Sequence, residues 1–525
     1  MAMVVKNNMS AINTLNTLNT NSTALSKSLA KVSSGMKING AADDASGYAI
    51  SERMRVQIRG LDQANANTQN GSSMMKTAEG AVSSTVDILK TLKEKVISAA
   101  NDDKTDADRQ AIQKELDQSI DQINDNANIT YNGKYLVDGS HNNAVEKATT
   151  TAFTNQSMAE SMKGNVEFTK ITDRNGNNIN IQEKDTVQIS FVKQGKTYTT
   201  SLQAGGHDMR DLAAAANLEM FKQQAIAKGV DLTQGDGSDG WSDFVSDYTD
   251  KVSDWIAAEE KVDEATNLTD KNTERGKADK AKTDFEKELK DITSTFADKV
   301  GLKGKLEFKE AIDMRMDSDT YIGKDKAGDS VYTADRSNGL SLHSAAAGVS
   351  NQISGITLSV SNTKGAVQKS VNAVLDNFSE TIRAENKSKD NAITLQVGTK
   401  ANQSIRVGLT DMRAEALGLQ SSNGETLNVT TQKNANAAIN VLDNALQKAL
   451  DQQTTIGSIE SRLEYTSTNL TTSSQNVQAS ESTIRDADMA KEMTNYTKNN
   501  VLLQAAQSML AQANQSSSSV LSLLQ

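Results

Sequence analysis

Two short segments have residue types that could bind phosphate. Residues 235–240 fit the G-x-G-x-x-G spacing of a dinucleotide-binding turn, in which backbone N–H groups approach a pyrophosphate. Asp236 and Asp239 would repel that phosphate, so we expect an acidic loop without a ligand. Residues 195–197 resemble the end of a phosphate-binding loop, but Ser190 stands where that loop requires glycine. Strand-like segments on both sides indicate a hairpin turn there instead.

The candidates for metal binding or catalysis also fail. Asp173, Asn175 and Asn177 mimic the start of a calcium loop, but Asn178 and Lys184 replace its required glycine and glutamate. The three histidines have no metal-binding neighbours in the sequence: His141, His207 and His343. The chain has no cysteine, which excludes disulfides, a thiolate nucleophile and cysteine-ligated metals. We therefore expect no enzyme activity, no cofactor and no metal ion.

Composition narrows the class of partner. The 525 residues carry a net charge of -11, whereas nucleic-acid-binding surfaces are basic. No apolar run approaches the roughly 18 residues of a spanning helix, and the N-terminus lacks the apolar core of a secretory signal. We expect neither nucleic acid nor membrane as a partner. Only 4% of the residues are aromatic, which favours helices packed along seams.

The two chain ends share an unusual composition. Residues 7–26 and 499–525 contain no charged side chain, yet both have apolar residues at helical spacing. An isolated helix in water usually has a charged outer face. Either these ends are frayed or disordered, or they are helices that other copies of the chain bury on more than one side. Uncharged polar faces suit the second interpretation, because burying an unpaired charge is costly.

Longer helical patterns lie inside the two ends. Apolar residues follow three/four spacing over residues 82–96, and a seven-residue register runs over residues 439–470, as in a coiled coil. Gln453, Glu460 and Ser467 interrupt that register, so an ordinary helical bundle remains an alternative. Because the patterns flank the middle from both ends, they could pair antiparallel. The predicted seam of this rod contains Val82, Leu89, Val96, Leu442, Leu446 and Leu463.

The middle of the chain, residues 166–384, predicts an α+β insert. Strands are expected at residues 166–171, 186–192, 197–202, 305–308 and 356–360, and helices at 208–228 and 241–300. Asn175-Gly176 indicates a hairpin turn. A further strand pair, 393–397 and 404–407, precedes the C-terminal helical pattern. The predicted fold class is mainly α: a coiled-coil-like rod from both chain ends with a β-hairpin, plus the α+β insert.

Several segments together resemble bacterial flagellin. They are residues 33–39 (SSGMKIN), 42–47 (ADDASG), 131–140 (YNGKYLVDGS), 395–398 (LQVG), 416–419 (ALGL), 484–490 (IRDADMA), 509–514 (MLAQAN) and 520–524 (VLSLL). The matches cover about 1–140 and 390–525, and the middle carries no such resemblance. Ser516–Ser519 depart from the pattern, since many relatives have a proline there.

The resemblance implies an architecture and a function. It implies an inner helical domain (1–44 and 486–525), a helical rod domain with a β-hairpin (45–165 and 385–485) and a variable outer domain (166–384). The chain would be the structural subunit of the flagellar filament for motility, extracellular and a helical homopolymer. The implied partners are the cap and hook-junction proteins, an export chaperone and the flagellar type III apparatus. Family members have unfolded ends as free monomers, which agrees with the charge-free composition above.

The resemblance also assigns residues to contacts. The terminal helices would form the inner tube, and we expect the self-assembly contacts at Met9, Ile12, Leu15, Leu18, Leu503, Leu510, Leu521 and Leu524. A host Toll-like receptor reads the family through the rod helices. In activating members the positions of Thr91 and Lys95 are Arg and Leu, whereas Glu115 keeps its acidic counterpart. Arginine and packed apolar anchors are typical hot spots, so we expect weak receptor activation.

Two alternatives remain open from the sequence. A hook–filament junction protein shares the terminal signatures, although the segments at 395–398 and 416–419 favour the filament subunit. The outer insert could also be an adhesin or an inserted enzyme. The absence of an H-E-x-x-H motif argues against an inserted metalloprotease.

Overall fold

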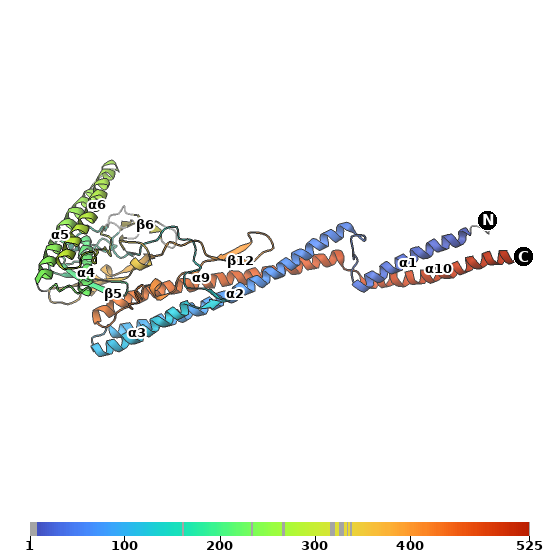
Figure 1. Cartoon of the computed structure of the whole chain (residues 1–525), viewed down its shortest axis with the longest axis horizontal. Helices are drawn as coiled ribbons and strands as arrows, with labels where there is room; N and C mark the ends of the chain where they lie inside the picture. Colours follow the sequence, from blue (N-terminus) through green and yellow to red (C-terminus); the bar gives the residue numbers. More distant parts are fainter. Residues whose placement is uncertain are drawn as a thin grey trace. The chain divides into compact units, whose positions relative to one another are not determined.

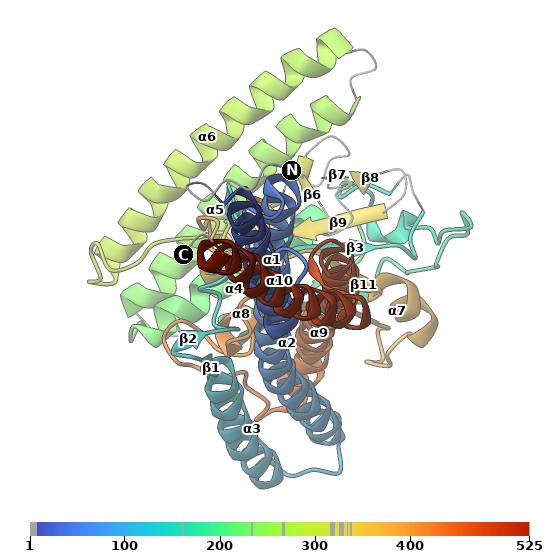
Figure 2. The ribbon, with the colours of Figure 1, turned by 90° about the vertical axis from the view of Figure 1, so that its right-hand side faces the viewer.

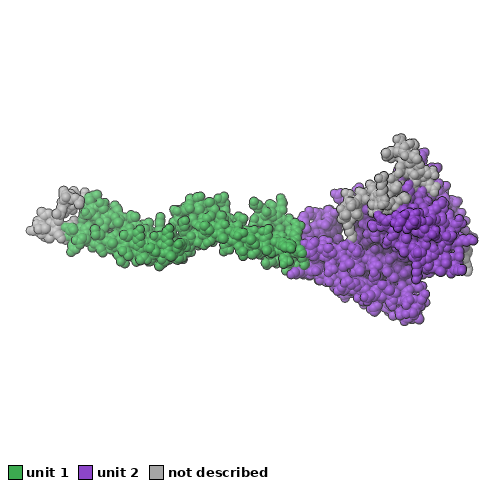
Figure 3. All heavy atoms as spheres, turned by 180° about the vertical axis from the view of Figure 1, so that it is seen from behind, with its two compact units in different colours: residues 1–73, 394–405, 460–525 green, residues 74–393, 406–459 purple. Residues whose placement is uncertain are grey.

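The computed structural model describes residues 8–159, 162–232, 235–264, 268–314, 321–324, 330–332, 334–335 and 339–523. The chain divides into two compact units, shown in different colours in Figure 3. The first contains residues 1–73, 394–405 and 460–525, and the second contains residues 74–393 and 406–459. The prediction of a mainly helical chain with a β-containing insert is confirmed. No helix in the described part of the chain is long and apolar enough to span a membrane.

The first unit is built from four helical segments. α1 (Met9–Ser34) and α10 (Met489–Leu523) lie side by side and antiparallel (Figure 1). The unit also contains residues 45–73 of α2 (Ala45–Ala99) and residues 460–485 of α9 (Gln432–Arg485). Asn8 caps α1 by accepting the N–H of Ala11, and Gly35 ends it in the left-handed conformation. The predicted strand pair forms as β12 (Ile393–Gln396) and β13 (Ser404–Val407).

Two short connectors interrupt the helices of this unit. One, residues 35–44, joins α1 to α2, and the other, residues 486–488, joins α9 to α10. The connectors pair with each other: the Lys37 N–H donates to the Arg485 carbonyl at 2.7 Å, and the Ala487 N–H donates to the Gly35 carbonyl at 3.0 Å. The helices thus break close to the boundary we expected between inner and rod domains. The division into three domains itself stays a prediction.

Helices from both chain ends also pack together in the second unit. The contributing segments are residues 74–99 of α2, α3 (Asp106–Ala127) and residues 432–459 of α9. Thr105 and Asp108 form a capping box at the start of α3. Buried Arg109 donates from Nε to the Ala99 carbonyl, at 2.9 Å, and so closes the turn between α2 and α3. A two-residue hairpin, β1 (Thr130–Tyr131) and β2 (Lys134–Tyr135), follows α3.

The predicted rod seam is mostly buried. Five of its six residues have no more than 1% exposure: Val82, Leu89, Val96, Leu442 and Leu463. Leu446 is only half-buried, because the buried stripe of α9 passes through Ala445 and Gln452 instead of Leu446 and Gln453. The Oε1 of buried Gln452 accepts a hydrogen bond from the hydroxyl of Thr410 at 2.7 Å. A polar residue on the seam therefore has a polar partner there.

The outer insert belongs to the second unit and contains two main sheets. One has the order β10-β4-β5 and contains β4 (Thr186–Lys193), β5 (Lys196–Gln203) and β10 (Ile353–Ser361). The other has the order β11-β3-β9-β8 and contains β3 (Ala152–Asn155), β8 (Ala334–Asp335), β9 (Gly339–His343) and β11 (Phe378–Ile382). A separate pair is β6 (Tyr321–Lys324) with β7 (Ser330–Tyr332). All of these pairings are antiparallel.

Three helices pack over these sheets and share their hydrophobic core: α4 (Met209–Ala227), α5 (Gly235–Glu264) and α6 (Leu268–Lys299). Figure 2 shows α5 and α6 as a side-by-side pair. Phe221 lies at the centre of an aromatic cluster, 4.8 Å from Phe244 and 5.9 Å from Phe296 between ring centroids. The short helices are α7 (Lys369–Leu375), α8 (Ala414–Leu417) and the 3-10 turns η1 (Phe168–Lys170) and η2 (Val349–Asn351).

Most predicted elements of the insert are confirmed within a few residues, but four predictions are wrong. Residues 166–171 contain a 3-10 turn, not a strand, since the Phe168 N–H bonds to the carbonyl of His207. Asn175-Gly176 still forms a turn, with Gly176 at φ 83°, although no strand precedes it. Residues 305–308 are not a strand either. The predicted acidic loop at 235–240 is the first part of α5, and the helix expected over 241–300 is the two helices α5 and α6.

Candidate assembly surface

The contact between α1 and α10 buries few side chains fully. Ala11, Thr14 and Leu18 of α1 are half-buried, as are Leu503 and Leu510 of α10. Among the side chains described in these two helices, only those of Ser28 and Ala506 are fully buried. Hydrophobic stabilisation scales with buried apolar area, so this pair gains little from its own seam.

Asparagine side chains bridge the two helices at three levels. Asn8 Nδ2 donates to the carbonyl of Ala513 at 3.1 Å, and Asn21 Nδ2 donates to the carbonyl of Leu502 at 3.3 Å. Asn499 Nδ2 donates to the Ser28 hydroxyl at 3.1 Å. Each of these bonds is made in only one antiparallel register. No local sequence pattern predicts these bonds, because the paired residues are more than 470 positions apart.

Several large apolar side chains of both helices are exposed. On α1, Met9 is 60% exposed, and Ile12 and Leu15 are each 46% exposed. The exposed apolar residues of α10 are Met489, Met493, Val501, Leu502 and Met509. Charged side chains are absent from residues 8–26 and 499–523. The helix pair therefore presents large apolar side chains that the described residues leave exposed, most of them on the charge-free stretches.

Several hydroxyl groups on this surface already have a hydrogen-bond acceptor within their own helix. Four threonines of α1 donate to the carbonyl four residues earlier, at 2.7–3.0 Å: Thr14, Thr17, Thr20 and Thr23. Thr497 and Ser508 do the same in α10, at 2.9 and 3.1 Å. A hydroxyl with an internal acceptor can lose its water at lower cost than one without a partner. Burying these hydroxyl groups against another copy therefore costs less free energy than burying hydroxyl groups without a partner.

The structure places the predicted self-assembly residues in three groups. Met9, Ile12 and Leu15 are exposed, whereas Leu18, Leu503 and Leu510 are half-buried along the α1–α10 seam. Leu521 lies in α10, but its side chain is not among those described, and Leu524 lies outside the described residues. The role of all eight residues in assembly stays a prediction.

An arginine clamps the connectors of the same unit. The buried guanidinium of Arg485 lies 2.5 Å from Glu52 Oε1 and 3.2 Å from Met36 Sδ, and its carbon lies 5.4 Å from the Tyr48 ring centroid. The hydrogen bond from Arg485 holds the pKa of Glu52 below its usual value. Sequence reasoning identified Arg485 only as part of a signature and missed its partners.

The structure gives a physical role to two residues of the segment 42–47. Asp44 Oδ1 accepts the N–H groups of Ser46 and Gly47, both at 3.0 Å, at the start of α2. A Cβ on Gly47 would lie 2.5 Å from Asp44 Oδ2 and 2.7 Å from Ile38 Cδ1. A side chain at this position would therefore have to displace the Asp44 carboxylate that caps α2 and the buried Ile38.

The residues predicted to face a receptor lie on the α2–α3 surface. Lys95 Nζ and Glu115 Oε1 form an ion pair at 3.1 Å, and both side chains are about half exposed. Thr91 is exposed, and its hydroxyl donates to the carbonyl of Asp87 at 3.0 Å. Glu115, which keeps the acidic character of activating members, is thus paired with Lys95, which stands where those members have a leucine.

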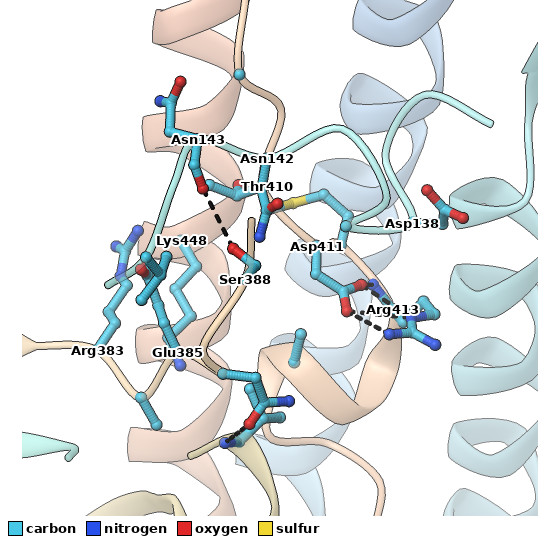
Figure 4. Close-up of a pocket in the computed structure, with 18 of the residues that line it drawn as sticks. Asp138, Asn142, Asn143, Arg383, Glu385, Ser388, Thr410, Asp411, Arg413 and Lys448 are labelled. Atoms are coloured by element: carbon cyan, nitrogen blue, oxygen red, sulfur yellow. Dashed lines mark hydrogen bonds and ion pairs between the residues drawn. The ribbon is translucent and has the colours of Figure 1, made fainter. Parts of the chain in front are cut away.

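The second unit also contains a cavity of about 390 Å³ (Figure 4). Its charged lining includes Asp411 and Arg413, which pair at 2.6 Å, and Lys448, which pairs with Glu380 at 3.2 Å. Burial raises the pKa of Glu385, although Arg383 and Lys448 oppose this. Across the described residues, no group of three His, Cys, Asp or Glu side chains could hold a metal ion. The cavity offers paired charges rather than a reactive centre.

Comparison with known proteins identifies similarity at both chain ends. Residues 5–142 match the model of the bacterial flagellin N-terminal helical region, and residues 439–524 match that of the C-terminal helical region. The chain is 28% identical to a flagellin of Clostridium tyrobutyricum, covering 98% of this chain and 99% of the relative. It is also 28% identical to a flagellin of Aquifex aeolicus over the full length of both. A flagellar filament core protein of Brachyspira hyodysenteriae is 48% identical over 122 residues, 23% of this chain and 43% of the relative.

Proposed function

The chain belongs to the bacterial flagellin family and is a structural subunit of the flagellar filament, and on this premise we propose that α1 and α10 form its main subunit contact. Flagellins polymerise with themselves and are not enzymes. The hook–filament junction and adhesin alternatives are not favoured, because the full-length relatives are flagellins. The filament is an extracellular appendage.

One observation carries the proposal: the large apolar side chains of α1 and α10 that the described residues leave exposed. A filament requires a heterologous interface, in which one surface meets a different surface of the next copy without closing a ring. Apolar residues on both sides of the narrow seam would let one helix pair contact more than one neighbour. Ile12 and Leu15 on α1 and Leu502 on α10 are the strongest candidates, since each is large and more than 40% exposed.

We further propose that the ends of the chain gain stable order only on assembly. Ordering one residue costs about 1–2 kcal/mol, whereas burying one Leu side chain fully contributes about 1.5–3 kcal/mol. The α1–α10 seam buries only Ser28 and Ala506 completely among the side chains described. Helices with few buried apolar contacts open easily. Neighbouring copies would supply the missing burial.

Deletion of residues 516–525 tests the contact. The truncated chain should keep a folded outer insert, because the core of the insert is built from residues 153–375. It should fail to form sedimentable polymer when seeded with filament fragments. Near-UV circular dichroism, which reports Trp241 and Trp255 in the insert, provides the control for folding. Long filaments of the truncated chain would refute the proposal.

We propose further partners and domain boundaries by analogy with the family. We infer contacts with the cap and hook-junction proteins at the filament ends, and with an export chaperone and the flagellar type III apparatus before assembly. We also propose the inner, rod and outer domains with boundaries near residues 45, 165, 385 and 485. Growth of filaments from purified subunits on isolated hooks, with and without cap protein, would test the first of these contacts.

For the host Toll-like receptor we propose weak activation. The Lys95–Glu115 ion pair supports this, because a receptor group that seeks the Glu115 carboxylate would compete with Lys95. A reporter-cell assay with purified monomer, compared with an activating flagellin at equal concentration, tests it. A response of equal potency would overturn this proposal without affecting the filament function.

A further inference from the structure

The exposed methionines have an uneven distribution in this chain. Among the described side chains, four methionines are 43–62% exposed: Met9, Met489, Met493 and Met509. All four lie on α1 or α10. Eight others are at most 8% exposed, and all lie outside those helices: Met74, Met75, Met158, Met162, Met209, Met220, Met314 and Met412. Exposed thioethers are therefore concentrated on the candidate assembly surface.

The chemistry of the thioether makes these positions distinct from leucine. A hydroperoxide transfers one oxygen atom to the sulfur, so that methionine becomes methionine sulfoxide and hydrogen peroxide becomes water. The sulfur loses two electrons and the peroxide gains them, and no further reactant is needed. The product is polar and accepts hydrogen bonds, whereas the original side chain is flexible and apolar.

We propose that Met9, Met489, Met493 and Met509 are an oxidation site that controls whether a free subunit can join a filament. This rests on the proposed role of α1 and α10 in the subunit contact. Peroxide reaches the four sulfurs in the free subunit because their side chains are exposed. In the filament, neighbouring copies cover them and slow the reaction.

Oxidation opposes assembly because it adds a polar oxygen to side chains that assembly would bury. Hydroxyl groups of α1 and α10 bond to the carbonyls of their own helices, as at Thr14 and Thr497, and so are prepared for burial. A sulfoxide oxygen at Met509, in the interior of α10, has no such internal donor, because the N–H groups of the helix around it are engaged in the backbone. It would be buried against apolar side chains without a partner, which is costly.

The experiment compares free subunits and preformed filaments treated with hydrogen peroxide. Mass spectrometry of peptides gives the extent of oxidation at each methionine, and sedimentation gives the critical concentration for seeded polymerisation. Oxidised wild-type subunits should show a rise of about tenfold or more in critical concentration. Oxidation of the four methionines should be markedly slower in filaments than in subunits. Methionine sulfoxide reductase should restore polymerisation.

A matched variant locates the effect. The combined substitutions Met9→Leu, Met489→Leu, Met493→Leu and Met509→Leu keep the surface apolar but remove the reactive sulfurs. We expect peroxide treatment to leave the critical concentration of this variant at the value it has before treatment. If the peroxide-treated variant loses polymerisation as the wild type does, oxidation acts elsewhere and the proposal is wrong.

Two further results would also overturn it. One is unchanged polymerisation of wild-type subunits whose four methionines are oxidised. The other is equal oxidation rates in subunits and filaments. These results are distinguishable from failure of the proposed subunit contact, which is tested separately with unoxidised protein by the truncation at residue 516 and by substitutions at Ile12 and Leu15.

Discussion

The double substitution Ile12→Ser and Leu15→Ser examines the assembly surface most sharply. Both side chains are 46% exposed on α1. Fully burying such a side chain contributes about 1.5–3 kcal/mol, so covering the exposed half of each contributes about 1 kcal/mol. Losing about 2 kcal/mol per subunit should raise the critical concentration about 30-fold, since 1.4 kcal/mol corresponds to a factor of about ten.

The assay is seeded polymerisation followed by sedimentation over a range of subunit concentrations. The variant should reach the same polymer as the wild type, but only above the higher critical concentration. The matched control is Ile226→Ser with Val367→Ser, two residues of the outer insert that are 51% and 58% exposed. This control removes similar exposed apolar surface away from α1 and α10, so its critical concentration should not change.

A conservative double variant separates the effect of apolar burial on polymerisation from the effect of helix propensity. Ile12→Leu with Leu15→Met keeps the apolar surface and should polymerise like the wild type. Unchanged critical concentration for the serine variant, or an equal rise in the insert control, would refute the reasoning.

Three further predictions concern other parts of the chain. Replacing Arg485 by Met removes the clamp on Glu52 and should lower the temperature at which filaments depolymerise, as followed by light scattering; no change would contradict the role of the clamp. Burial raises the pKa of Asp376 from 3.8 to about 7, so the folded state prefers the protonated form. The stability from this group is present below about pH 4 and is lost as the pH rises toward 7. Asp376→Asn keeps an acceptor for the Leu358 N–H, which lies 2.7 Å from Oδ1, and should raise the melting temperature of the insert at pH 8 but not at pH 4. Thr91→Arg with Lys95→Leu should increase receptor activation in reporter cells at least tenfold, since each hot-spot residue contributes about 2 kcal/mol or more; an unchanged response would contradict the proposed contact.

The sequence predicted the helical parts of the fold well, because their signals are local and repeat. The three/four spacing from Val82 to Val96 corresponds to one buried face of α2. In α9 the same approach chose Leu446 over the neighbouring Ala445, since hydrophobicity alone favours the larger residue. At the next turn the buried residue is Gln452, whose Oε1 accepts a hydrogen bond from Thr410. Such a partner is not visible in a seven-residue register.

The insert shows where local patterns fail. Val166–Ile171 alternates like a strand, but a long-range hydrogen bond from Phe168 to His207 decides its conformation. The acidic residues 235–240 suggested a loop, yet aspartates are favourable near a helix N-terminus, and Trp241 and Phe244 then anchor α5 in the aromatic core. Tertiary contacts outweigh local propensity in both cases.

The candidate surface was partly predictable for a different reason. The absence of charge at both chain ends drew attention to the segments that form α1 and α10. It could not show which apolar residues face each other and which face outward. That division depends on the register set by Asn8, Asn21 and Asn499, and their partners lie at the opposite end of the chain.

Hydrogen exchange measured by mass spectrometry, on dilute free subunits and on filaments, tests the central claim most directly. The two segments to compare are residues 9–34 and 489–523, with residues 209–227 of α4 as an internal reference for a stable helix. The account predicts rapid exchange of both terminal segments in the free subunit, protection of both in the filament, and protection of α4 in each state. Terminal segments as strongly protected in the free subunit as in the filament would contradict it.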